Sequence, residues 1–122
     1  MKRLLIVDDD PNIVMALDYL MRSKGLDVSI ARNGGEALQA LEAGRFDLVL
    51  LDITMPDVDG FEICATIKAH PEWRSTHVVF LSAKSKQEDI NRGLELGATD
   101  YIVKPFSTRF LSRRVLEILD VQ

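Results

Sequence analysis

Short apolar runs alternate with segments of helical periodicity along the whole chain. A short apolar run bounded by polar or turn-forming residues is typical of a strand that is buried on both faces of a sheet. Between these runs, apolar residues recur at intervals of three and four, which is the spacing of an amphipathic helix. The predicted strands are Leu4–Val7, Val28–Ala31, Leu48–Leu51, Val78–Leu81 and Tyr101–Val103.

Capping signals predict where the helices begin and end. Asp10-Pro11 fits an N-cap residue followed by the first residue of a helix. Ser85 and Glu88 have the spacing of a capping box, which predicts the start of a fourth, more polar helix. The other predicted boundaries are Gly25 and Gly44 after the first two helices, Gly60 and Pro71 around the third, Gly97 after the fourth and Ser107 before the fifth.

Five strands alternating with five helices predict an α/β fold with short connections. We expect a doubly wound, five-stranded parallel sheet with right-handed crossovers and helices on both faces. The common strand order at this size is 2-1-3-4-5, the flavodoxin-like arrangement, whose ligands bind beyond the carboxyl ends of the strands. Since no linker, internal repeat or low-complexity segment interrupts the pattern, we expect residues 1–122 to form one domain.

Polar side chains follow four of the five predicted strands. Asp8 and Asp9 follow the first strand, Asp52 the third, Ser82 the fourth and Lys104 the fifth. The order 2-1-3-4-5 makes these four strands adjacent, so their carboxyl ends meet at one edge of the sheet. We therefore expect these side chains to converge on a single rim.

The predicted rim favours phosphoryl chemistry. Three carboxylates at adjacent strand ends repel one another unless a cation lies among them, and ligands that are all oxygen suit Mg²⁺, with Mn²⁺ as the alternative. Beside such a cation, Asp52 can attack a phosphorus atom as a carboxylate nucleophile. Lys104 would pair with the phosphoryl group as a point charge, and the Ser82 hydroxyl would donate to a phosphoryl oxygen.

The composition of the chain narrows the setting. Apolar residues make up 47% and charged residues 28%, as in ordinary globular proteins. The net charge of −4, with both signs interspersed, gives no electrostatic basis for direct nucleic-acid binding. The single cysteine, Cys64, fits a reducing compartment. The apolar run after Met1-Lys2-Arg3 is too short for a signal peptide or a membrane span, so we expect a cytoplasmic domain with no membrane partner.

In order and spacing, the rim residues resemble the receiver domain of bacterial two-component response regulators. The resemblance covers essentially the whole chain and rests on Asp8-Asp9, Leu51-Asp52-x-x-Met55-Pro56-x-x-x-Gly60, Ser82-Ala83 and Lys104-Pro105-Phe106. It implies that Asp52 becomes 4-aspartylphosphate by accepting the phosphoryl group of a phosphohistidine, on a sensor histidine kinase or a phosphotransfer protein. It also implies that Mg²⁺ is bound by Asp9, Asp52 and the Thr54 backbone carbonyl, while Asp8 acts largely through water.

The resemblance further implies a signalling switch that catalyses only its own phosphorylation and dephosphorylation. Ser82 would move toward the phosphoryl group, and Tyr101 would turn inward into the vacated space, although Tyr101 equally fits an ordinary packing aromatic. The Lys104-Pro105 bond is expected to be cis. Output would pass through the fourth helix, fifth strand and fifth helix to a downstream protein or an output domain absent from this chain, or through a phosphorylation-dependent homodimer.

Three other functions stay open at this point. A flavin or nucleotide carrier would need a phosphate-binding loop after the first strand, where Asp8-Asp9-Asp10 would repel phosphate. A Mg²⁺-dependent aspartyl phosphatase resembling the haloacid dehalogenases would need a second aspartate two residues after Asp52, where Thr54 stands. The last alternative is a receiver-like protein-interaction module that phosphorylation does not regulate.

Several polar residues receive no chemical role from the sequence. Asp57 and Asp59 are interpreted as turn residues that lead into the third helix. His70 and His77 lie far from the rim in the predicted topology. Cys64 is predicted to pack on the core-facing side of the third helix.

Overall fold

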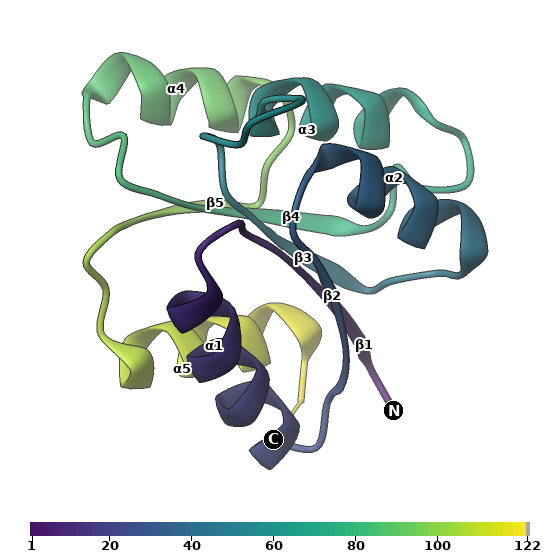
Figure 1. The fold of residues 1–122 in the computed structure, drawn as a ribbon, viewed down its shortest axis with the longest axis vertical. Coiled ribbons are helices and arrows are strands. Elements are labelled where there is room, and N and C mark those ends of the chain that lie inside the picture. The colour runs from purple at the N-terminus through teal and green to yellow at the C-terminus, as the bar shows by residue number, and fades with distance from the viewer. Residues whose placement is uncertain (122) are drawn as a thin grey trace.

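A parallel sheet of five strands forms the centre of the computed structural model, which describes residues 1–121. Its strand order is β2-β1-β3-β4-β5, and each neighbouring pair runs parallel (Figure 1). The predicted fold class and strand order are therefore confirmed. The strands are β1 (Arg3–Val7), β2 (Asp27–Ala31), β3 (Leu48–Leu51), β4 (His77–Ser82) and β5 (Asp100–Val103).

Helices cover both faces of this sheet. Figure 1 places α1 and α5 on one face and α2, α3 and α4 on the other. No helix among residues 1–121 has the length and apolar character needed to cross a bilayer. The helices are α1 (Pro11–Ser23), α2 (Gly34–Ala43), α3 (Gly60–Ala69), α4 (Gln87–Glu95) and α5 (Thr108–Leu119).

Two hydrophobic cores lie between the sheet and its helices. Side chains of a strand point alternately to the two faces, so consecutive residues of one buried strand enter different cores. In β1, Leu5 and Val7 pack under α2, α3 and α4, whereas Leu4 and Ile6 pack under α1 and α5. This arrangement explains why the strands read as continuous apolar runs rather than as alternating patterns.

Most of the predicted helix boundaries are confirmed. Asp10 caps α1 by accepting a hydrogen bond from the Asn12 backbone N–H, and Pro11 is the first helical residue. Ser107 caps α5 by accepting from the Phe110 N–H. Gly25, which follows α1, adopts a left-handed backbone with φ of +84°.

The capping box predicted at Ser85 is wrong. Helix α4 begins at Gln87, and its N-cap residue, Lys86, makes no side-chain capping hydrogen bond. The backbone just before Ser85 is already engaged, because Lys84 donates its N–H to Ser82 Oγ and accepts a hydrogen bond from Tyr101 at its carbonyl. These contacts hold the connection after β4 in a non-helical path, so the helix starts later than the local sequence indicates.

Candidate functional site

Strand pairing brings the predicted rim residues to one edge of the sheet. The ladder continues one residue past the strands: the Asp52 N–H donates to the Val7 carbonyl at 2.9 Å, and the Lys104 N–H donates to the Ser82 carbonyl at 2.8 Å. The side chains that follow the strands are thereby fixed next to one another. One carboxylate oxygen from each of Asp8, Asp9 and Asp52 lies within 4.8 Å of the other two, as predicted.

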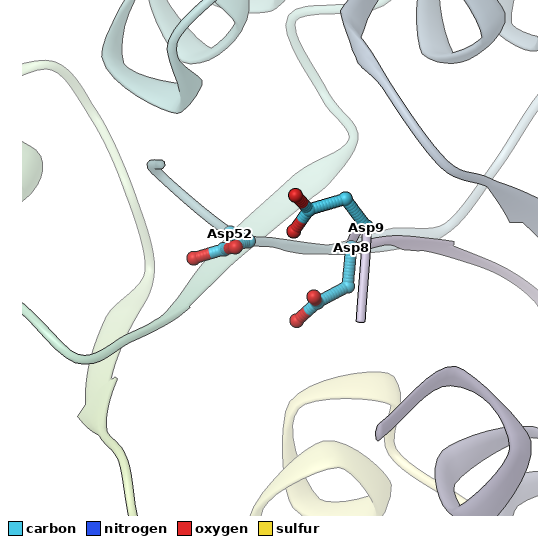
Figure 2. A group of neighbouring side chains, drawn as sticks. All are labelled: Asp8, Asp9 and Asp52. Atoms are coloured by element: carbon cyan, nitrogen blue, oxygen red, sulfur yellow. The ribbon is translucent and has the colours of Figure 1, made fainter. Parts of the chain in front are cut away.

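Two of these carboxylates are buried and share one lysine. Asp8 is 1% exposed and Asp52 is 6% exposed, whereas Asp9 lies on the surface. Lys104 Nζ donates to Asp8 Oδ2 at 2.9 Å and lies 3.8 Å from Asp52 Oδ1. Asp52 Oδ1 also accepts the Ile53 N–H at 2.8 Å. Figure 2 shows the three carboxyl groups projecting to the same side from the ends of β1 and β3.

The surroundings of Asp52 raise the pKa of its carboxyl. Burial raises the pKa of this carboxyl from its ordinary 3.8 to about 6, and the negative charges of Asp8 and Asp9 contribute in the same direction. Lys104 and the Ile53 N–H lower the pKa but do not compensate. Burial is the main cause of the raised pKa, and an additional cation would stabilise the ionised form of Asp52.

The donor set fits a hard divalent cation. Three clustered carboxylates, one of them exposed, offer only oxygen ligands on a side open to water. Mg²⁺ favours such sites because it keeps several of its waters and binds one or two carboxylates. Thr54 lies on the exposed loop that follows Asp52, on the same edge of the sheet.

Ser82 and Tyr101 lie next to the carboxylate cluster and meet at the backbone of Lys84. Ser82 is the last residue of β4 and is 1% exposed, with its Oγ accepting the Lys84 N–H at 3.1 Å. The Tyr101 hydroxyl donates to the Lys84 carbonyl at 2.7 Å, and its ring packs against Phe80 with centroids 5.7 Å apart. The Tyr101 side chain is buried in this structure, at 8% exposure.

The helix facing Tyr101 approaches it closely. A Cβ added to Gly93 of α4 would lie 3.0 Å from the Tyr101 ring and 2.9 Å from the Phe80 ring.

The expected cis Lys104-Pro105 bond is present beyond β5.

Asp57 is the residue at this edge that sequence reasoning undervalued. Its carboxylate accepts three hydrogen bonds from backbone N–H groups, those of Gly34 and Gly35 at the start of α2 and that of Val58. These donors lower the pKa of Asp57. The paired glycines that open α2 are the one local sign of such a contact. Asp59 leads into α3 as predicted, and it caps that helix by accepting a hydrogen bond from the Glu62 N–H.

The residues that were given no chemical role lie away from the rim. Cys64 is fully buried in the core beneath α2, α3 and α4, as predicted. His70 stacks on Trp73 with ring centroids 3.8 Å apart. His77 begins β4, at the opposite edge of the sheet, where its Nδ1 lies 2.9 Å from Thr99 Oγ1.

Comparisons with known proteins agree on one family. The family profile described as the response regulator receiver domain matches residues 4–116. The alkaline phosphatase synthesis transcriptional regulatory protein PhoP of Bacillus subtilis is 41% identical over 97% of this chain. The DNA-binding response regulator MtrA of Mycolicibacterium smegmatis is 39% identical over 93% of it. The chain spans 48% and 49% of the lengths of these two relatives.

Solved structures give the same result at the level of the fold. The BeF3-activated receiver domain of DrrB superposes with a TM-score of 0.90 at 33% identity, covering 98% of both chains. A CheY-like receiver domain protein from Methanospirillum hungatei is 35% identical with a TM-score of 0.90, covering 98% of this chain and 94% of its own.

Proposed function

Since this chain belongs to the family of response regulator receiver domains, we propose that it accepts a phosphoryl group on Asp52. The observation that carries the proposal is the position of Asp52, whose carboxylate lies within 4.8 Å of those of Asp8 and Asp9 and 3.8 Å from Lys104 Nζ. One lysine neutralises the charge of this carboxylate poorly, so its ionised form is stabilised by any group that arrives together with a cation. The reaction would form 4-aspartylphosphate.

Asp52 would act as the nucleophile through one carboxylate oxygen. Oδ1 accepts the Ile53 N–H, which orients the carboxylate, and we assign the attack to Oδ2. A bond forms between this oxygen and phosphorus while the bond from phosphorus to the donor nitrogen breaks, and the electron pair of that bond leaves with the imidazole. Negative charge is spread over the three phosphoryl oxygens during the transfer.

The surrounding residues would stabilise that charge. Lys104, which now donates to Asp8 Oδ2, would contact one phosphoryl oxygen, and the Ser82 hydroxyl would donate to another. We propose that Asp9, Asp52 and the Thr54 backbone carbonyl hold Mg²⁺ (or Mn²⁺) directly, with Asp8 acting largely through water. The ion, when bound, supplies positive charge that offsets the phosphoryl oxygens.

The remaining proposals concern signalling. The phosphoryl donor would be the phosphohistidine of a sensor histidine kinase or a phosphotransfer protein, and a rearrangement of Ser82 and Tyr101 would alter the surface of α4, β5 and α5. Because curated relatives are about twice as long, we propose that output requires a protein or domain beyond residues 1–122. Those residues would form one receiver domain, located in the cytoplasm, that is a switch rather than a turnover enzyme.

Incubation with Mg²⁺ and acetyl phosphate tests the acceptor. Mass spectrometry of the intact chain should detect one added phosphoryl group, and Asp52→Asn should abolish it. Asp47→Asn is a matched control, because Asp47 immediately precedes β3 as Asp52 immediately follows it, and it should leave the addition intact. A wild-type chain that gains no mass would contradict the proposal and favour a module that phosphorylation does not regulate. Repeated turnover of a chromogenic phosphate ester would instead favour a phosphatase.

A further inference from the structure

Asp57 joins two elements that are far apart in the sequence. It lies in the loop of residues 52–59 between β3 and α3, yet it accepts the backbone N–H groups of Gly34 and Gly35, each at 2.9 Å. These are the first two residues of α2. Free N–H groups at a helix start carry partial positive charge, so a carboxylate placed there is favoured.

The start of α2 and the loop that holds Asp57 fit closely against each other. Helix α2 has its own cap, since Asn33 Oδ1 accepts the Glu36 N–H at 2.9 Å, so Asp57 supplies acceptors that the local sequence does not. A Cβ added to Gly34 would lie 2.7 Å from Val58 Cβ, a distance that real Cβ atoms essentially never show. The glycine therefore allows the loop to approach the helix.

In the middle of the loop, Met55 and Val58 pack against the core, but hydrogen bonds to other elements are scarce. At its start, Ile53 donates its N–H to Asp52 Oδ1, and at its end Gly60 donates to the Ile53 carbonyl at 2.9 Å. Within the described part of the chain, the bonds of Asp57 are the only hydrogen bonds that tie residues 54–58 to another element. The backbone of Thr54 is in that stretch.

We propose that Asp57 is a positioning residue for the metal-binding loop, which holds the Thr54 backbone near the carboxylate cluster by fastening the loop to the start of α2. This inference rests on the proposed function, because it assumes that Mg²⁺ binds at the cluster. It has a reciprocal consequence. If the anchor strengthens Mg²⁺ binding by some factor, bound Mg²⁺ must strengthen the anchor by the same factor.

Mg²⁺ affinity of variants tests the first half of this linkage. Asp57→Ala should weaken Mg²⁺ binding by about fivefold, measured by following backbone amide resonances during a Mg²⁺ titration. Asn33→Ala is the matched control, because it removes the helix's own cap without touching the loop. It should lower thermal stability but leave Mg²⁺ affinity within about twofold.

Substitutions at two adjacent glycines test the contact from the side of α2. Gly34→Ala places a methyl group against Val58 and should also weaken Mg²⁺ binding. At Gly35 an added Cβ would lie 3.4 Å from Asn33 Oδ1 and 3.5 Å from Asp57 Oδ2, which are ordinary contacts. Gly35→Ala should therefore bind Mg²⁺ as the wild type does.

Hydrogen exchange in the wild type tests the second half of this linkage. Saturating Mg²⁺ should slow exchange of the Gly34 and Gly35 amides by about the factor lost in Asp57→Ala, while the Glu36 amide, bonded to Asn33, should change less. A wild type that binds Mg²⁺ with no effect of Asp57→Ala, or with unchanged exchange at both glycines, would overturn this inference and leave the proposed function standing. A wild type that binds no Mg²⁺ would overturn both.

Discussion

The edge of the sheet where the strands begin and the edge where they end differ in how their charged groups are neutralised. At the edge where the strands begin, two cations have partners of their own: Arg3 pairs with Asp27 at 3.4 Å and stacks on Phe46, and Lys68 Nζ donates to the Thr76 carbonyl at 2.7 Å. At the edge where the strands end, Lys104 is the one cation among the described residues that pairs with Asp8 and Asp52, and Asp9 has no ion-pair partner there.

Because of this difference, one edge mainly stabilises the fold and the other is suited to binding a ligand. Local pairing at the first edge lowers the free energy of the folded state and leaves nothing for a ligand to complete. At the second edge the unbalanced charge destabilises the folded protein, and that imbalance is what a divalent cation and a phosphoryl group would relieve. Substitutions at the two edges should therefore have opposite kinds of effect.

The largest expected difference concerns two lysines. Lys104→Met should slow phosphoryl uptake from acetyl phosphate by about 100-fold, because it removes a cation that would stabilise charge on the transferring group. Lys68→Met, at the opposite edge, should leave that rate unchanged while lowering stability, since it removes a hydrogen bond to the Thr76 carbonyl. Quenched time courses read by mass spectrometry measure both rates. Equal rates of phosphoryl uptake in the two variants would contradict the proposed difference between the two edges.

The next effect is a gain of stability at the charged edge. A pKa raised from 3.8 to about 6 means that the folded protein favours protonated Asp52, a contribution present below pH 3.8 and lost as pH rises through 6. In metal-free buffer above that pH, Asp52→Asn should therefore be more stable than the wild type by roughly 3 kcal/mol. The gain should vanish below pH 3.8, as measured by urea denaturation across this pH range. A loss of stability at pH 7.5 would contradict this account.

The smallest effect is a loss at the opposite edge. Thr76 is buried, and its hydroxyl donates to the Phe46 carbonyl at 2.9 Å. Thr76→Val keeps the shape but leaves that carbonyl without its donor, so unfolding should become easier by about 1–2 kcal/mol. Phosphoryl uptake should stay at the wild-type level. Urea denaturation and the acetyl phosphate assay provide the two measurements, and a substantial change in uptake would show that the edges are coupled.

The strands and most helix ends could be predicted because their signals are local. A run such as Leu48–Leu51 is apolar because both of its faces are buried, and Asp10 or Ser107 caps the helix that directly follows it. The convergence of Asp8, Asp52 and Lys104 followed from the strand order alone. It needed no knowledge of side-chain contacts, since the carboxyl ends of parallel strands meet at one edge.

Other features were decided only when distant segments met. The sequence could not reveal that Lys104 donates to Asp8 at 2.9 Å rather than to Asp52, or that contacts at Lys84 delay the start of α4. Nor could it reveal that Asp57 reaches α2, 22 and 23 residues away in the chain. Periodicity encodes which face of an element is buried, whereas such contacts depend on how closely two loops approach. At Gly34 that approach is decided by a single missing Cβ, which leaves no periodic pattern in the sequence.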